Sequence, residues 1–228
     1  MKIGVVLPTF RWSPEEALDV AAAAERSGLD GVFAYDHLWP MGNPERPAIA
    51  PFPLLATVAR RHPGLIVGPL VARIGLVDDE VLVEQFLGLE AVAPGRVIAA
   101  LGTGDKLSSA ENEAYGIEFA PAAQRRESLA RVASEIRERK IPAWIGGGAR
   151  PTVELAETLG CAVNMWGASR EAAAEQATRS EVTWAGLLDA EDERAATDAL
   201  EAVAEAGATW AVVGWPASLN VLARVSGH

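Results

Sequence analysis

The stretch AERSGLDGVFAY, residues 24–35, decides the fold that this sequence predicts. It has the pattern of a helix end, a glycine that stops the helix in a left-handed cap, and a short apolar strand. The same order recurs in AETLGCAVNMW (156–166) and AEAGATWAVVGW (204–215), and LEAVAPGRVIAALG (89–102) is a fourth version with Pro-Gly as the stop. Repeated helix-to-strand connections of this kind indicate a parallel α/β fold.

When the same pattern is followed along the whole chain of 228 residues, it predicts eight strands, at 3–8, 31–35, 66–72, 97–102, 143–146, 162–166, 182–187 and 209–215. Helical patterns separate them, near 14–27, 53–61, 80–93, 121–139, 151–159, 170–179, 191–206 and 216–225. The first helix should have Ser13 as its N-cap and Pro14 at its first helical position. Eight alternating units predict a (βα)8 TIM barrel formed by a single domain over 1–228. An open, doubly wound sheet is the alternative, because alternation alone does not show closure.

Composition narrows the classes of partner. The formal net charge of −11 argues against nucleic acid, because proteins that bind phosphate backbones usually have a basic face. Cys161 is the single cysteine, so no intrachain disulfide can form and nothing suggests an oxidising compartment. The apolar run at the N-terminus is interrupted by Pro8 and is too short for a signal peptide or a membrane span. We therefore expect a cytoplasmic protein with no membrane or nucleic-acid partner.

Two long loops mark the expected active site. In an α/β barrel the site lies where the strands end and the loops to the helices begin. The loops 36–52 and 103–120 are long for a compact domain, which favours a function for them. Asp36 and His37 open the first of them, and His37 can act as an acid–base group because its charge changes near neutral pH. Asp36 equally fits a role as the cap of the following turn, and a single histidine is often structural.

Two glycine-rich segments are candidates for cofactor contacts. In GTGDK (102–106) the glycines let the backbone approach a ligand closely and Asp105 adds a carboxylate, although a tight turn explains the segment as well. In WIGGGARPT (144–152) a strand runs through three glycines into a helix, whose free N–H groups and dipole favour an anion, particularly phosphate. Neither segment matches the dinucleotide fingerprint or the Walker loop.

Tryptophan and histidine complete the inventory of site residues. Indoles at or just beyond strand ends suit an extended flat ligand, or simply pack the core, and four are so placed: Trp12, Trp39, Trp166 and Trp215. The three histidines lack the spacing of a metal site, so no metal is expected.

Four segments resemble the bacterial luciferase-like flavin and deazaflavin oxidoreductases: AAAAERSGLDGVFAYDHLWP (21–40), EQFLGLEAVAPGRVIAALGTGD (84–105), ENEAYG (111–116) and IPAWIGGGARPTVELAETLG (141–160). The resemblance implies a (βα)8 barrel with a cofactor ring across its mouth and the cofactor phosphate at Gly147, Gly148 and Ala149. It also implies a non-prolyl cis peptide bond at Leu70-Val71, behind the ring. The chain is shorter than most members of that family and lacks their long insertion near the mouth.

The expected function is that of an oxidoreductase that transfers a hydride between the deazaflavin F420 and a small organic substrate. The expected catalytic residues are His37, Asp36 and Asp105, and the substrate contacts are Trp39 and Trp166. The expected cofactor contacts are Leu70, Val71, Gly102, Thr103, Gly104, Gly147, Gly148, Ala149 and Arg150. The alternatives are an FMN-dependent monooxygenase, a cofactor-binding barrel without catalysis, and a non-redox barrel enzyme that acts on phosphorylated sugars. Barrels of this family often pair through their helices, which makes a homodimer an option.

Overall fold

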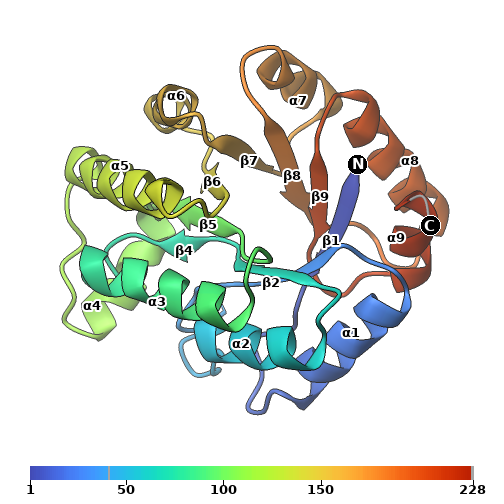
Figure 1. The fold of residues 1–228 in the computed structure, drawn as a ribbon, viewed down its shortest axis with the longest axis horizontal. Helices are drawn as coiled ribbons and strands as arrows, with labels where there is room; N and C mark the ends of the chain where they lie inside the picture. Colours follow the sequence, from blue (N-terminus) through green and yellow to red (C-terminus); the bar gives the residue numbers. More distant parts are fainter. Residues whose placement is uncertain (41, 227–228) are drawn as a thin grey trace.

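The computed structural model describes residues 1–40 and 42–226, and in them strands and helices alternate along the chain (Figure 1). The strands are β1 (Lys2–Val6), β2 (Gly31–Ala34), β3 (Ile66–Pro69), β4 (Ala72–Arg73), β5 (Ala99–Gly102), β6 (Ala143–Gly146), β7 (Ala162–Trp166), β8 (Val182–Gly186) and β9 (Trp210–Val213). The helices are α1 (Glu15–Arg26), α2 (Pro51–Arg61), α3 (Asp79–Val92), α4 (Ser109–Ala114), α5 (Ala122–Glu138), α6 (Arg150–Leu159), α7 (Arg170–Ala177), α8 (Glu193–Glu205) and α9 (Leu219–Val225). A 3₁₀ turn, η1 (Lys106–Ser108), precedes α4.

The strands form a barrel, as the alternation predicted. Every strand pairing is parallel, and the order is β3-β2-β1-β9-β8-β7-β6-β5-β4. β3 and β4 are two parts of the single strand expected at 66–72, and the cis peptide bond between Leu70 and Val71 lies between them. The two ends of the sheet therefore meet, and Val67 of β3 also bridges Val97, just before β5. An open, doubly wound sheet is excluded.

The helix ends confirm that glycines stop the helices in a left-handed cap, which is the pattern from which the fold was predicted. The glycines after the four quoted helices all have left-handed backbone, with φ values of 73° at Gly28, 70° at Gly95, 62° at Gly160 and 92° at Gly207. L-residues with a Cβ adopt this conformation at a cost, so glycine fixes where each helix stops. The start of α1 differs from the prediction. Its N-cap is Pro14, which has αR backbone, so Ser13 lies outside the cap.

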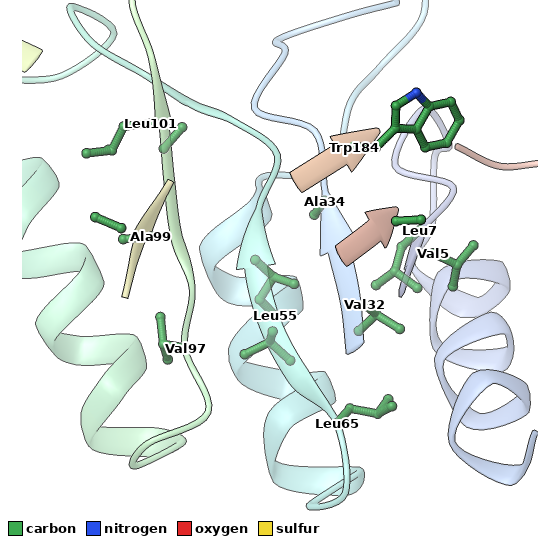
Figure 2. Packing of buried hydrophobic residues seen from close by; sticks show 14 of the residues in the cluster. Val5, Leu7, Val32, Ala34, Leu55, Leu65, Val97, Ala99, Leu101 and Trp184 are labelled. Carbon is green, nitrogen blue, oxygen red and sulfur yellow. The ribbon is translucent and has the colours of Figure 1, made fainter. Parts of the chain in front are cut away.

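The core has two layers because side chains alternate along a strand. Val5, Leu7, Val32 and Ala34 point outward and pack against the helices, which surround the strands (Figures 1 and 2). Val6, Phe33 and Val212 belong to a separate buried cluster inside the barrel.

Three aromatic rings fill the interior of the barrel. Phe33 stacks on Trp144 with ring centroids 5.4 Å apart, and Trp210 meets both rings edge-on at 5.8 Å and 5.5 Å. Gly4 makes room for them, since a Cβ there would lie 2.9 Å from the Phe33 ring. The interior is thus packed, and space for a ligand remains only at the ends of the barrel. In the described part of the chain, no helix has the length and apolarity needed to cross a membrane.

Candidate active site

A cavity of about 1200 Å³ lies at the carboxyl ends of the strands, where the sequence placed the site. Its lining includes most of the predicted residues: Asp36, His37, Leu70, Val71, Gly102, Thr103, Gly104, Asp105, Gly147, Gly148, Arg150 and Trp166. Segments from distant parts of the chain converge here because all the strands are parallel and end on the same side. Ala149 and Trp39 are not among the lining residues.

Of the four tryptophans expected near the mouth, Trp166 alone lines the cavity. Trp39 is buried and stacks on Tyr115, with ring centroids 6.1 Å apart, so it packs the loop rather than facing the cavity. Trp12 is exposed, and Trp215 donates a hydrogen bond to Glu16 at 3.3 Å. Sequence position alone did not separate these roles, because strand ends also supply core contacts.

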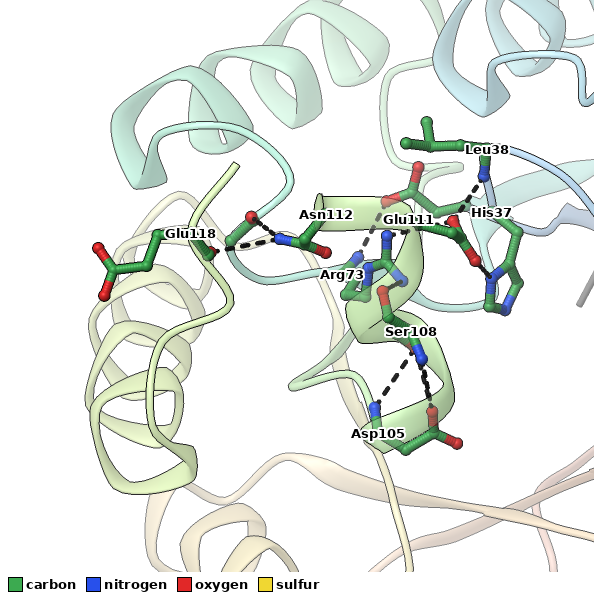
Figure 3. Close-up of polar contacts among 10 residues, drawn as sticks. His37, Leu38, Arg73, Asp105, Ser108, Glu111, Asn112 and Glu118 are labelled. Carbon is green, nitrogen blue, oxygen red and sulfur yellow. Dashed lines mark hydrogen bonds and ion pairs between the residues drawn. The ribbon is translucent and has the colours of Figure 1, made fainter. Parts of the chain in front are cut away.

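His37 is held by a buried carboxylate that the sequence reasoning missed. Its Nδ1 lies 2.7 Å from Oε1 of Glu111, on α4 (Figure 3). The other carboxylate oxygen accepts hydrogen bonds from the backbone N–H of Leu38 at 2.7 Å and from Nη2 of Arg73 at 3.2 Å. A carboxylate can only accept, so the neutral His37 ring carries its proton on Nδ1 and leaves Nε2 as an acceptor.

Glu111 keeps its charge despite its burial. Burial raises the pKa of this carboxyl group, but hydrogen bonds from His37 and from the Leu38 N–H, with the positive charge of Arg73, outweigh that effect. The net result is a pKa below the ordinary value of 4.5. The carboxylate behind the His37 ring is therefore ionised at neutral pH.

Asn112 fixes the position of α4, and with it Glu111. Its Nδ2 donates to the backbone carbonyls of Gly75 at 2.9 Å and Glu118 at 3.3 Å (Figure 3). These bonds join α4 to the segment that follows β4 and to the chain that leads into α5. The ENEAYG segment was expected to lie in a loop, and nothing in it indicated a partner for His37, 74 residues away in the chain.

Asp36 and Asp105 both have structural partners. Oδ2 of Asp36 accepts the backbone N–H of Arg73 at 2.9 Å, which ties the end of β2 to β4. Burial raises the pKa of Asp36 above 3.8, even though the Arg73 N–H and the Arg73 charge oppose the rise. Oδ1 of Asp105 accepts from the N–H and hydroxyl of Ser108 at 3.1 Å and 3.2 Å, so it closes the turn into η1. The tight turn weighed for the GTGDK segment is present at Asp105, whereas Asp36 binds a distant strand and does not cap the turn that follows it. Both residues line the cavity.

An apolar bed lies at the bottom of the cavity, formed by Leu70 and Val71. The methyl groups of Val71 sit directly over two glycines. A Cβ on Gly102 would lie 2.5 Å from one methyl group, and a Cβ on Gly146 would lie 2.8 Å from the other. The glycines at the ends of β5 and β6 are therefore needed to seat Val71.

The amino-terminal end of α6 is open to the cavity. Gly147, with φ 136°, and Gly148 lead into this helix, and nothing lies within 4 Å of a Cβ built on Gly148. The N-cap residue Ala149 offers no side-chain hydrogen bond, and the first turn, which is described in full, holds no acidic residue. Pro151 has no N–H, and the N–H groups of Thr152 and Val153 both bond to the carbonyl of Ala149. The donors that this end can offer an anion are therefore the N–H groups from Gly148 to Arg150, together with the positive end of the helix dipole.

Fold and site together define the class. The protein is a parallel (βα)8 barrel whose mouth cavity combines an imidazole–carboxylate pair, an apolar bed and an uncapped helix end. Within that class, the chain belongs to the luciferase-like monooxygenase family, whose model matches residues 1–209. The resemblance drawn from the sequence motifs is confirmed.

Curated relatives share parts of this chain. The F420-dependent glucose-6-phosphate dehydrogenase of Nakamurella multipartita is 32% identical over 109 residues, which cover 47% of this chain and 32% of that protein. The F420-dependent hydroxymycolic acid dehydrogenase of Mycobacterium tuberculosis is 30% identical over 116 residues, which cover 50% of this chain and 32% of that protein. The chain thus spans about a third of the length of these two relatives.

Solved structures share the fold. An F420-dependent secondary alcohol dehydrogenase, in complex with an F420-acetone adduct, matches with a TM-score of 0.83 at 14% identity, over 98% of this chain and 97% of that one. Monooxygenase RslO1 from Streptomyces bottropensis matches with a TM-score of 0.73 at 14% identity, over 100% of this chain and 97% of that one.

Proposed function

We propose that this protein is an F420-dependent oxidoreductase that transfers a hydride between the deazaflavin ring and a small alcohol or carbonyl compound. The names of the relatives support F420 over FMN. The observation that carries the proposal is the His37–Glu111 pair on the wall of a cavity of about 1200 Å³. Small-molecule pockets commonly measure about 300–1000 Å³, and this cavity, which extends from the barrel mouth into the space between α6 and α7, is larger.

The residues present fit the cofactor. Its flat ring requires an apolar surface, which Leu70 and Val71 provide, and its phosphate requires N–H donors, which the Gly147–Gly148 turn and the start of α6 provide. When bound, F420 supplies the two-electron hydride chemistry of the reaction.

His37 handles the proton of the reaction. Oxidation of an alcohol removes a hydride from the carbinol carbon and a proton from the hydroxyl group. Nε2 of His37 is the acceptor for that proton, and in the reverse direction the imidazolium returns it to the carbonyl oxygen. Glu111 accepts the Nδ1–H bond throughout, so it orients the ring and stabilises the imidazolium as it forms. Glu111 acts through His37 and is a positioning residue.

A fluorescence titration of the purified protein with F420 and, separately, with FMN tests the proposal. We expect micromolar binding of F420 and no binding of FMN. A preference for FMN would replace the proposal with an FMN-dependent monooxygenase. Binding of neither would leave a barrel that shares only the family fold, for which phosphorylated sugars become the ligands to test.

The proposal also covers the cellular compartment and the assembly of the protein. The single cysteine, which is buried, favours the cytoplasm. Pairing of two chains through their outer helices is the option that the family resemblance offers for the assembly. Light scattering on the purified protein would show a dimer mass, and a monomer mass would remove this part of the proposal.

A further inference from the structure

The cavity has walls of two kinds. His37, Arg73, Asp105 and Ser108 make one wall polar. The other wall consists of large apolar side chains that follow β1, β2 and β8 or lie in β7. We call it the aromatic wall: Phe10, Tyr35, Met165, Trp166 and Leu187. In the strand order β9 lies between β1 and β8. A Cβ built on Gly214, just after β9, would lie 2.5 Å from a methyl group of Leu187 and 3.0 Å from the Tyr35 hydroxyl oxygen, so these two side chains approach each other across the end of β9 and the wall is continuous.

The aromatic wall is ordered by ring contacts. Phe10 stacks on Tyr35 with centroids 5.7 Å apart, and Tyr35 meets Trp166 at 6.0 Å. Burial raises the pKa of Tyr35 to about 12, so its hydroxyl remains neutral and adds no charge to the wall. Trp166 is 51% exposed and Leu187 is 66% exposed, although both face the cavity. Large apolar side chains left open in a pocket indicate a ligand with an apolar body.

The charges of the cavity oppose a second anion. Each arginine that lines it is already paired: Arg73 with Glu111 at 3.2 Å, Arg150 with Glu154 at 2.7 Å, and Arg179 with Glu157 at 3.3 Å. Acidic side chains outnumber the arginines in the lining: Asp36, Asp105, Glu154, Glu157 and Glu175 against Arg73, Arg150 and Arg179. The open start of α6 is suited to an anion, but under the proposed function the cofactor phosphate occupies it. A phosphate monoester, which carries a charge near −2, would have to displace a carboxylate from an arginine in a lining where acidic groups predominate.

We propose, resting on the function proposed above, that the substrate is an uncharged alcohol or carbonyl compound with an aromatic or other apolar body, held between His37 and the aromatic wall, and not a phosphorylated sugar. The hydroxyl or carbonyl oxygen lies at the polar wall, where His37 exchanges its proton. The apolar body covers Trp166. This choice departs from the substrate in the name of the Nakamurella relative.

The test compares matched substrates in the F420-loaded protein. The reduction of F420 is followed with 1-phenylethanol, cyclohexanol, glucose and glucose 6-phosphate. We expect 1-phenylethanol to have the highest kcat/KM and glucose 6-phosphate the lowest. Trp166→Ala should raise the KM for 1-phenylethanol roughly tenfold, with the kcat changed much less, because it removes binding contacts rather than the base. Trp12→Ala is the matched control, since Trp12 is exposed and outside the cavity lining, and it should leave both constants unchanged.

A second measurement separates this inference from the proposed function. Saturation-transfer NMR on the cofactor-free protein reports whether the phenyl protons of 1-phenylethanol contact the protein, and Trp166→Ala should abolish that signal. If F420 fails to bind but this signal is present and lost in the variant, the proposed function fails and the substrate class stands. The proposed substrate class would be overturned if glucose 6-phosphate were the preferred substrate. It would also be overturned if Trp166→Ala changed neither the NMR signal nor the KM for 1-phenylethanol.

Discussion

Glu111 fixes the orientation of the His37 imidazole ring. With one nitrogen 2.7 Å from a buried carboxylate oxygen, the ring presents its second nitrogen as the acceptor, and the ring cannot flip without losing that bond. The same carboxylate binds the Leu38 N–H and Arg73, so a shift of Glu111 would disturb three partners at once. A group held in this way meets the requirement for a positioned acid–base residue better than a free histidine on a loop would.

Two substitutions distinguish the role of His37 as the base from the role of Glu111 as the residue that positions it. His37→Ala should lower the kcat by about 10²- to 10⁴-fold, because the proton acceptor is lost. Glu111→Gln should lower the kcat less, by about tenfold or more, while the KM and the affinity for F420 hold, because the ring loses the charge that stabilises the imidazolium. The measurements are steady-state F420 reduction and F420 titration. Glu113→Gln, on the exposed part of α4, is the control. An unchanged kcat in His37→Ala would remove this residue from the mechanism.

The carboxyl groups of Glu111 and Asp36 should make the stability of the folded chain depend on pH in acid. The pKa of Glu111 lies below 4.5 in the folded chain, so its contribution to stability is present above the unfolded value and is lost as pH falls through the folded pKa. The pKa of Asp36 is raised by burial, so its contribution has the opposite sign and is lost as pH rises from the unfolded value of 3.8 through the folded pKa.

Urea unfolding at several pH values checks both signs. The destabilisation caused by Glu111→Gln should be largest at neutral pH and should shrink in acid, below about pH 4.5. Asp36→Asn is the matched control, and its effect should move in the opposite direction over the acid range. A Glu111→Gln effect that is the same at neutral and acid pH would show that charge at this position does not contribute to folding.

At the scale of elements, the proposed phosphate site at the start of α6 consists of backbone N–H groups, and a single carboxylate should block it. Gly148 has ordinary backbone and open space around it, so Gly148→Asp places a negative charge beside the helix end without a clash. We expect F420 to bind about tenfold more weakly, since a like charge disfavours the phosphate there. Gly88→Asp adds the same charge on the exposed face of α3, also with open space, and should leave the affinity unchanged. Equal affinities in the two variants would place the phosphate elsewhere.

The elements also explain how far the sequence could predict this site. Helix ends were predictable because a left-handed residue almost requires glycine, as at Gly28 and Gly160. Helix α4 was not predictable, because six residues are too few to establish a helical period. Glu111 was therefore assigned to a loop, and the position of its partner His37 is set by tertiary contacts that no local pattern encodes. Arg73 was missed for the same reason, since a buried arginine is identified by its partners.

For the whole molecule, closure of the barrel depends on contacts that sequence patterns do not report. Alternating units predicted the strands, yet the junction between β3 and β5 joins residues 67 and 97, and only the structure shows them bridged. The position of Trp39 follows from the same kind of contact, because the loop that contains it folds against Tyr115. Local pattern thus predicted the end of the barrel at which the cavity lies, and long-range packing decided which residues line that cavity.

Gly68 provides a test of closure in the whole barrel. It lies in β3, and a Cβ there would be 2.3 Å from the carbonyl oxygen of Ile98, an atom of the backbone that cannot rotate away. Gly68→Ala must therefore push β3 from the segment before β5, and should lower the free energy of unfolding by about 1–3 kcal/mol in urea titrations. Gly88→Ala, in the open and exposed part of α3, is the matched control and should raise it by about 0.5–1 kcal/mol. Because Leu70 and Val71 continue directly from β3, the first variant should also weaken F420 binding, whereas the control should not. Equal stability effects for the two alanines would mean that β3 can separate from the segment before β5 without loss of stability. In that case, closure of the barrel at this junction would not hold the apolar bed of Leu70 and Val71 in place.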